Sequence, residues 1–438
     1  MDLQEQLKAF GHARVIVVLK PRKTRRRDGH RELALAETID LQQDVAQQCG
    51  KYFRPFADSR TQLIANDLHR GRGAAPDRAG MERAIMARTT TKARPAFRYF
   101  RHLGVMFGTV DRKGLNRLIA SKSAVASVLS PPEFSLIAPH PVTTADAMAE
   151  GPTWGLRRLG IPGLWERGIY GDGVLIGHLD TGVDATHPAL ANAVDVFAEF
   201  DSLGEIVPSA ATADTGIHGT HTAGILVGQP FKGAMFGVAP KAKLAAAVVI
   251  EGGDVPARVL GALDWCVEQS CRVINMSLGI RGYEPLFEDI LDLLRERNIL
   301  PVAAVGNEGP LTSRSPGNHL PVVSVGAIDD TDHVWWSSSS QRVPGKQRVV
   351  PDLVTPGVAV WSSVPGGSVK QLSGTSMAAP HVAGLAALLM SHRPDASVAM
   401  IEEAIYRSCR RPANASTIRA NRGIPDGDAA RTWLEQNT

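Results

Sequence analysis

Short apolar runs alternate with helix-like stretches from Trp154 to the end of the chain. The runs cover residues 174–179, 244–250, 273–276, 300–305 and 321–325. Strands that are apolar along their whole length, and that are separated by helices, are typical of a parallel sheet buried on both faces. The pattern therefore predicts an α/β fold with a doubly wound, mostly parallel sheet, which we assign to a domain over residues 152–438.

The first part of the chain has a different pattern. Residues 13–20, 97–110 and 124–129 are expected to form strands, and residues 33–48 and 112–120 helices. Together they predict a smaller α+β unit of β-α-β type within residues 1–136. The stretch 50–96 is rich in Arg, Ala and Gly, so residues 21–96 could be an insertion with a separate regulatory or partner-binding role. Prolines and threonines mark 137–151 as a linker.

Composition and charge refine this division. A hydrophobic content of 44% and a charged content of 21% are ordinary for a globular protein, and four cysteines are too few for a disulfide scaffold. Residues 1–150 carry 25 Lys and Arg against 15 Asp and Glu, whereas the remainder carries 23 against 29. Opposite charges would favour docking of the first part on the second. A chance inequality of surface charge explains the same numbers equally well.

The sequence offers no sign of a membrane or nucleic-acid partner. The first residues are acidic where a signal peptide needs positive charge, and no apolar run is long enough to span a bilayer. We therefore expect a cytoplasmic protein. The basic run at 21–31 has no interleaved aromatic residues, so a solvated loop is the better interpretation than a nucleic-acid site.

Four polar segments follow predicted strands or open predicted helices, where active sites of α/β proteins gather. They cover residues 180–182, 218–224, 306–309 and 374–384. A serine hydroxyl needs an adjacent base, an imidazole can serve as that base, and a carboxylate can orient the imidazole. The segments supply Ser376, His218 and Asp180 for these roles. At a helix N-terminus, Ser376 would also present its backbone N–H to a developing oxyanion.

The motifs Asp180-Thr181-Gly182, His218-Gly219-Thr220-His221 and Gly374-Thr375-Ser376-Met377-Ala378-Ala379-Pro380-His381 resemble those of the subtilisin family of serine proteases. The resemblance implies a serine endopeptidase with Asp180 as orienting acid, His218 as general base and Ser376 as nucleophile. It also implies that the amide of Asn307 is an oxyanion donor. Metal binding by His218 and His221 is the weaker alternative, because no Glu completes a zincin pattern.

The same resemblance suggests how a protein or peptide substrate binds. Ser277, Leu278 and Gly279 resemble the edge strand that holds substrate in an antiparallel pairing, and Gly252 and Gly253 would form the opposite edge. Ala304 and Gly306 resemble a wall of the primary specificity pocket. Small uncharged walls favour an apolar residue before the scissile bond, although Glu308 at the rim would favour a basic one, and the sequence leaves this choice open.

No cofactor is required by this chemistry. Many secreted subtilisins bind a tight calcium through an Asp after their His-Pro pair and an Asn-bearing loop. Here His187-Pro188 is followed by alanine and leucine, and the loop 229–233 carries Phe231 and Lys232, whose side chains offer no oxygen ligand. We expect this calcium site to be absent, and leave weaker calcium sites elsewhere open.

The resemblance also implies a role for the N-terminal region. Subtilisins of this type are commonly made as zymogens whose prodomain assists folding, inhibits the enzyme and is removed by it. This implies that the N-terminal region is an intramolecular inhibitor, with a cut between about Leu136 and Gly151. Two alternatives are a narrow processing protease for one partner and a pseudoprotease or binding module whose N-terminal region stays docked.

Overall fold

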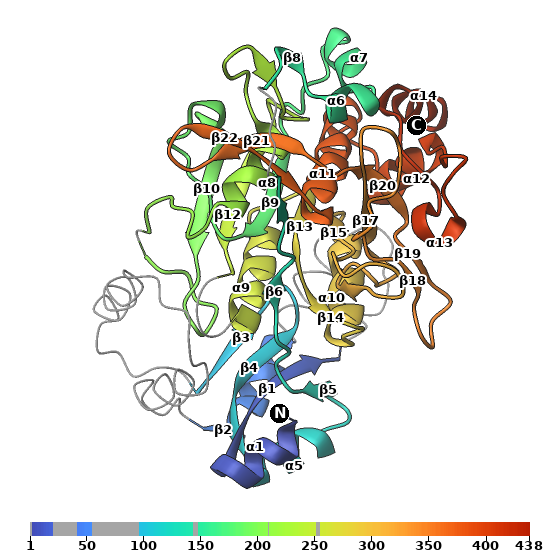
Figure 1. The fold of residues 1–438 in the computed structure, drawn as a ribbon. Helices are drawn as coiled ribbons and strands as arrows, with labels where there is room; N and C mark the ends of the chain where they lie inside the picture. The colour runs from blue at the N-terminus through green and yellow to red at the C-terminus, as the bar shows by residue number, and fades with distance from the viewer. Residues whose placement is uncertain (1, 21–41, 55–95, 143–147, 209, 251–254) are drawn as a thin grey trace. The chain divides into compact units, whose positions relative to one another are not determined.

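The computed structural model describes residues 2–20, 42–54, 96–142, 148–208, 210–250 and 255–438 (Figure 1). Its contacts divide into two compact units, Met1–Pro131 and Pro132–Thr438. Each unit has a hydrophobic core of its own. Residues 132–136 therefore pack with the second unit. No helix in the described part of the chain combines the length and hydropathy needed to cross a bilayer.

The N-terminal unit is an antiparallel sheet with helices. Strands β1 (His12–Leu19), β2 (Phe53–Arg54), β4 (Val105–Asp111) and β5 (Val125–Leu129) follow the order β2-β4-β1-β5, and β3 (Phe97–Phe100) also pairs with β4. The helices are α1 (Leu3–Phe10), residues 42–50 and α5 (Arg112–Ala120). The single strand predicted over 97–110 was wrong, because a turn at Gly104, whose φ is 65°, divides it into β3 and β4.

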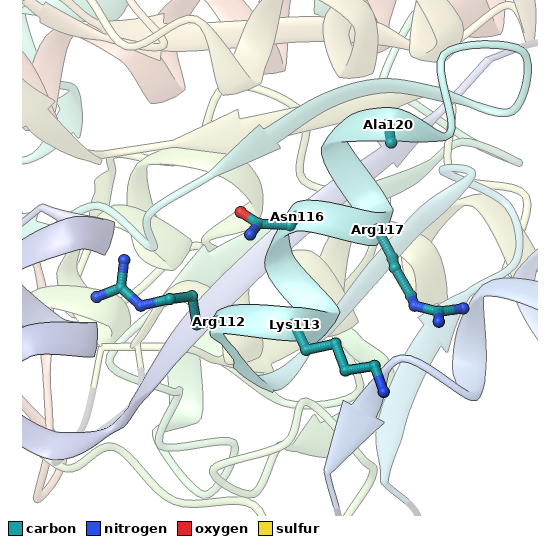
Figure 2. Close-up of a pocket in the computed structure, with 5 residues that line it drawn as sticks. All are labelled: Arg112, Lys113, Asn116, Arg117 and Ala120. Atoms are coloured by element: carbon teal, nitrogen blue, oxygen red, sulfur yellow. The ribbon is translucent and has the colours of Figure 1, made fainter.

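Helix α5 presents basic side chains outward from this unit. Asp111 caps it by accepting a hydrogen bond from the backbone N–H of Gly114 at 2.7 Å. Figure 2 shows the residues that line a shallow pocket along α5: Arg112, Lys113, Asn116, Arg117 and Ala120. None of them belongs to the four segments that the sequence marks for chemistry. Most of the predicted insertion 21–96 and of the helix predicted at 33–48 lies outside the described residues.

The second unit is built on a seven-stranded sheet in which every pairing is parallel. Its order is β10-β12-β9-β13-β15-β17-β20. In the same order, the strands span Val194–Glu199, Lys243–Val248, Leu175–Asp180, Val273–Met276, Leu300–Ala304, Val323–Ile328 and Leu353–Pro356. The parallel sheet of the predicted α/β fold is confirmed, and its five predicted strands lie within a few residues of their expected places. The outer strands β10 and β20 were not predicted.

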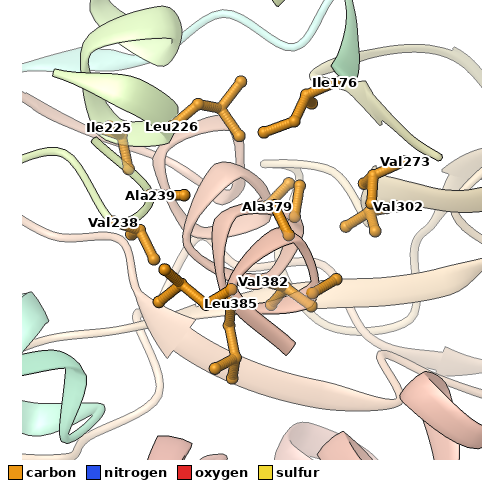
Figure 3. Close-up of a cluster of buried hydrophobic side chains, with 14 of the residues drawn as sticks. Ile176, Ile225, Leu226, Val238, Ala239, Val273, Val302, Ala379, Val382 and Leu385 are labelled. Carbon is orange, nitrogen blue, oxygen red and sulfur yellow. The ribbon is translucent and has the colours of Figure 1, made fainter. Parts of the chain in front are cut away.

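Two helices that carry site residues pack on one face of this sheet. They are α8 (His218–Val227) and α11 (Thr375–His392). Figure 3 shows Ile176, Val273 and Val302 of the strands on the side of α11 where Ala379 lies, and these residues belong to one buried cluster. Helix α11 is buried over residues 375–390 because it is apolar on all sides. Full burial of one such leucine contributes about 1.5–3 kcal/mol.

The opposite face is covered by α9 (Val255–Glu268). An added Cβ on Gly177 would lie 2.8 Å from the sulfur of Cys266 in α9, whereas its neighbour Ile176 points toward α11. Successive side chains of a strand point to opposite faces, so the sheet is covered on both sides. The remaining helices are α6 (Trp154–Arg158), α7 (Ile161–Glu166), α10 (Leu286–Glu296), α12 (Val398–Ser408), α13 (Thr417–Ala420) and α14 (Gly427–Asn437).

Candidate active site

Three separate elements bring Asp180, His218 and Ser376 to one end of the sheet. Asp180 is the last residue of β9, His218 is the first of α8, and Ser376 is in the first turn of α11. The Nδ1 atom of His218 lies 2.7 Å from Oδ1 and 3.0 Å from Oδ2 of Asp180. The backbone N–H of Thr181 also donates to Oδ1, at 2.7 Å. The carboxylate is thus fixed behind the imidazole, as an orienting acid needs to be.

The environment keeps Asp180 ionised although it is fully buried. Burial by itself would raise the pKa of its carboxyl, but the charge and hydrogen bond of His218, with smaller contributions from His178 and Thr181, hold that pKa below its usual value. An ionised carboxylate stabilises the imidazolium that forms when His218 accepts a proton.

Asn307 is oriented by the turn that precedes the nucleophile. Its Oδ1 accepts hydrogen bonds from the backbone N–H of Thr375 at 2.9 Å and from the Thr375 hydroxyl at 2.8 Å. These two bonds leave Nδ2 pointing into the site, where it donates to the carbonyl of Ala138 at 2.9 Å. A Cβ at Gly374 would lie 2.9 Å from Nδ2, so glycine is what allows the amide this position.

A segment of the chain itself lies across this site. Strand β6 (Ser135–Leu136) pairs antiparallel with β14 (Leu278–Arg281), so that Leu136 faces Leu278 and Ser135 faces Gly279. The next residue, Ile137, donates its N–H to the carbonyl of Ser277 at 3.5 Å.

Beyond Ile137 the segment continues past the nucleophile. Strand β7 (His140–Pro141) pairs with the end of β22 (Ser368–Ser373), just before α11. The His140 ring lies edge-on to Trp335, with ring centroids 4.9 Å apart. Both sides of the nucleophile therefore hold extended polypeptide in the manner of β-strand addition.

The nucleophile is engaged by this segment and not by the base. The Oγ of Ser376 donates to the carbonyl of Ile137 at 2.9 Å. The Nε2 of His218 has no hydrogen-bond partner among the described residues. The Ser376 hydroxyl must turn from Ile137 to His218 before its proton can be abstracted.

Among the predicted substrate residues, Ser277, Leu278 and Gly279 contact the bound segment directly. Ala304 ends β15 and is buried, and Gly306, which precedes the predicted oxyanion donor Asn307, donates its N–H to the Thr375 hydroxyl at 3.3 Å. Gly252 and Gly253 lie outside the described residues, so the opposite edge remains a prediction.

Arg314 is a residue that the sequence analysis missed. Its Nε donates to Oε1 of Glu308 at 2.8 Å, its guanidinium also donates to Ser135 at 2.7 Å and to the carbonyl of Gly279 at 3.3 Å, and only 7% of its side chain is exposed. Burial would raise the pKa of Glu308, but Arg314 holds it below the usual range. The negative charge of Glu308, at the predicted rim of the specificity pocket, is therefore neutralised. No spacing in the sequence marks Arg314, because strand β16 (Arg314–Ser315) places it beside β14 only in the fold.

The metal alternative finds little support in the geometry. His221 faces away from His218, with its Nε2 3.0 Å from the carbonyl of Lys370, and burial lowers its pKa to about 3. In the part of the chain that the structure describes, no group of three or more His, Cys, Asp or Glu residues is arranged to hold a metal ion.

The profile of the subtilase family matches residues 171–425, which span more than half of the chain and include all three residues of the Asp-His-Ser constellation. The chain belongs to the subtilase family. This subtilase is 35% identical over 250 residues to M-protease of Shouchella clausii (strain KSM-K16), which covers 56% of this chain and 62% of that protein. It is 34% identical over 249 residues to Subtilisin BL of Lederbergia lenta, covering 56% and 87%.

A third relative, Subtilisin E of Bacillus subtilis (strain 168), is 31% identical over 268 residues, covering 59% of this subtilase and 66% of that protein. The aligned region thus spans slightly less than two thirds of M-protease and Subtilisin E, and most of Subtilisin BL. The Asp-His-Ser triad is general to the family, and these relatives support the expected serine endopeptidase chemistry.

Proposed function

We propose that this subtilase is a serine endopeptidase made as a zymogen, and that its own segment 132–142 occupies the active site until it is cut. The observation that carries the proposal is the pairing of Leu136 with Leu278, which leads the carbonyl of Ile137 to 2.9 Å from the Oγ of Ser376. A substrate bound by strand addition would approach the nucleophile in the same way.

The bond we propose to be cut joins Ile137 and Ala138. Ile137 is held through its N–H by Ser277, its side chain is fully buried, and its carbonyl is the one that Ser376 contacts. Ala138 is exposed. The buried isoleucine and the neutralised Glu308 favour an apolar residue before the scissile bond in other substrates too.

The chemistry follows from the residues present. The Oγ of Ser376 adds to the carbonyl carbon of Ile137 while Nε2 of His218 takes the hydroxyl proton, and Asp180 stabilises the imidazolium. His218 then gives that proton to the amine of Ala138, which leaves, and water hydrolyses the acyl-enzyme by the same steps. Asn307 supplies one oxyanion donor, worth about 3 kcal/mol in the transition state.

The resting arrangement differs from this reactive one in a specific way. Ser376 contacts the carbonyl of Ile137, whereas Asn307 donates to the carbonyl of Ala138, one residue further along. An oxyanion donor stabilises the transition state only when it reaches the carbonyl under attack. The offset supports self-inhibition, because cleavage requires the segment to shift until Asn307 reaches the carbonyl of Ile137.

The test is the intact mass of the wild-type chain beside Ser376→Ala, both expressed identically without added protease. We expect two wild-type fragments, one ending at Ile137 and one starting at Ala138, and a whole mutant. If both proteins stay whole, the segment is a lasting regulator and self-processing is wrong.

A fluorophosphonate probe separates an enzyme from a pseudoprotease. We expect it to label Ser376 in the purified fragment 138–438, and to label the whole Ser376→Ala chain not at all. A catalytic fragment that stays unlabelled would favour the binding-module alternative. Cleavage of a single protein among many candidates would favour a narrow processing protease over a general one.

A further inference from the structure

A second histidine lies behind the catalytic carboxylate. His178 stands two residues before Asp180 on β9, so both side chains point to the face of the sheet that α8 covers. The central strands of a parallel sheet are normally apolar, and His178 is fully buried. A buried imidazole of this kind requires hydrogen-bond partners.

Its partner is the hydroxyl of Thr222, one turn after His218 on α8. The Nε2 of His178 lies 2.8 Å from Oγ1 of Thr222, and that Oγ1 lies 3.2 Å from Oδ2 of Asp180. The carboxylate therefore has the Thr181 N–H on Oδ1, the Thr222 hydroxyl on Oδ2, and Nδ1 of His218 near both oxygens but closer to Oδ1. Nε2 of His178 is itself 3.9 Å from Oδ2, too far for a direct hydrogen bond.

The position of the proton on His178 determines which group donates in these hydrogen bonds. The Nδ1 atom of His178 has no partner among the described residues. A proton on Nδ1 would leave a buried N–H without an acceptor, which is rarer in proteins than an unpaired lone pair. The proton is thus favoured on Nε2, which donates to Thr222.

The Thr222 hydroxyl then has one hydrogen to give. Its possible acceptors are Oδ2 of Asp180 at 3.2 Å and the backbone carbonyls of His218 and Gly219 at 3.1 and 3.2 Å. Hydrogen bonds to an ionised acceptor are about twice as strong as those between neutral groups, so the carboxylate is favoured.

Among the described residues, three ionisable groups influence the hydrogen bonds that join His178, Thr222 and Asp180. Burial lowers the pKa of His178, against the opposing effect of Asp180 and Asp214, so the imidazole is neutral and acts as a dipole. His221 of α8 feels the charge of His218, but burial lowers the pKa of His221 to about 3, so this imidazole is neutral as well. The carboxylate of Asp214 accepts hydrogen bonds from the hydroxyl of Thr181 and from the backbone N–H and hydroxyl of Thr220, each 2.7 Å long or shorter.

We propose that His178 and Thr222 are positioning residues for Asp180, acting as a hydrogen-bond relay that runs from Nε2 of His178 through the Thr222 hydroxyl to Oδ2. The relay fixes the rotation of the carboxylate and takes up part of its negative charge. Without it, the carboxylate would favour the imidazolium of His218 more strongly, and the base would be lost to protonation at a higher pH.

The experiment measures the rate of fluorophosphonate labelling of Ser376 against pH in the self-processed protein. Thr222→Val keeps the shape of the side chain and removes the hydroxyl, whereas Thr222→Ser keeps the hydroxyl. We expect Thr222→Val to slow labelling about tenfold and to move the acid limb upward by roughly half a pH unit. Thr222→Ser is expected to restore the acid limb. His178→Phe should move the limb in the same direction as Thr222→Val, and His178→Gln, which retains an N–H donor, should move it less.

A purely structural role gives a different result. If Thr222→Val lowers the unfolding temperature while the acid limb stays in place, or if Thr222→Ser behaves like Thr222→Val, the relay is wrong. A second measurement does not need the variants to fold or the enzyme to react. In the full-length Ser376→Ala chain labelled with ¹⁵N-histidine, NMR should show the His178 proton on Nε2. A proton on Nδ1 of His178 would overturn the relay, even if the protein is an active protease. If the probe does not label the wild type, the protease function is contradicted but the relay is not.

Discussion

Thr375 fixes the side chain of Asn307 with two hydrogen bonds, one from its backbone N–H and one from its hydroxyl, both to Oδ1. The residue beside the nucleophile thereby determines where the Nδ2 of Asn307 points. An oxyanion donor that is oriented before the reaction costs no reorganisation when charge develops, which is the main source of its catalytic effect.

Gly374→Ala is expected to impair catalysis while leaving stability nearly unchanged. The backbone of Gly374 is extended, with φ at 164°, so alanine is tolerated, but its Cβ would stand 2.9 Å from Nδ2 of Asn307. Displacing this amide should lower kcat by about 10- to 100-fold, measured on a chromogenic peptide. The control is Gly163→Ala on α7, where nothing lies within 4 Å of the added Cβ. Equal kcat in both variants would contradict the assigned position of Asn307.

Arg314→Ala is expected to change substrate preference toward basic residues before the scissile bond. Removing the guanidinium frees the carboxylate of Glu308 at the pocket rim, where it can pair with lysine or arginine of a substrate. The ratio of kcat/KM for a lysine-bearing peptide to that for an isoleucine-bearing one should rise about tenfold or more. The unfolding free energy should fall by roughly 2 kcal/mol, less than for a fully buried pair.

Arg281→Ala is the matched control for that experiment. Arg281 lies 3.8 Å from the same carboxylate, but 79% of its side chain is exposed. An exposed pair of this kind contributes little, so preference and stability should stay close to wild type. If only the Arg281 variant preferred lysine, the exposed Arg281, and not Arg314, would be the residue that neutralises Glu308.

Acid should destabilise the protein in part through Glu308. Its folded pKa lies below its unfolded value, which is about 4.3. A depressed carboxyl pKa contributes stability that is present above the unfolded pKa and is lost as pH falls through the folded one. Asp180 acts in the same direction, with an unfolded pKa of about 3.9. In urea unfolding of the Ser376→Ala chain between pH 7 and pH 3, adding Glu308→Gln should therefore make the loss smaller. An unchanged loss would mean that Glu308 keeps its ordinary pKa in the fold.

Ile137→Gly is expected to slow self-processing. The isoleucine is fully buried, and removing it discards apolar contact that a substrate gains on binding before the scissile bond. The rate of fragment appearance by mass spectrometry should fall by about tenfold or more. Ala138→Gly, on the exposed side of the same bond, serves as the control and should process normally. If Ala138→Gly were cut at a bond other than the one between residues 137 and 138, and faster than the wild type, the scissile bond would lie elsewhere in 132–151.

Removal of calcium should leave the unfolding temperature unchanged, because we expect no tight calcium site at the loop 229–233. The ring of Phe231 packs against His187 with centroids 5.0 Å apart, Lys232 lies over the same ring, and the amide of Gln229 donates to the carbonyl of Pro240. A tight calcium at saturation would stabilise the fold by about 4 kcal/mol. Unfolding temperatures with EDTA and with calcium should therefore agree. A drop in EDTA that calcium reverses and magnesium does not would reveal a site.

The sequence by itself determined the five central strands of the sheet and the motifs that carry the chemistry. Continuous apolar runs such as 244–250 indicate buried strands, and parallel strands place the residues at their carboxyl ends together. Asp180, His218, Asn307 and Ser376 could therefore be found from local motifs, because each lies at a strand end or a helix start.

The tertiary structure decided what surrounds these residues. The pairing of Arg314 with Glu308 depends on β16 lying beside β14, and the hydrogen bond from Ser376 to Ile137 joins residues 239 positions apart. His178 lies within the predicted strand 174–179, but only the packing of α8 on β9 brings the Thr222 hydroxyl to it. Such contacts follow from the positions of side chains after the elements pack, and no local pattern encodes them.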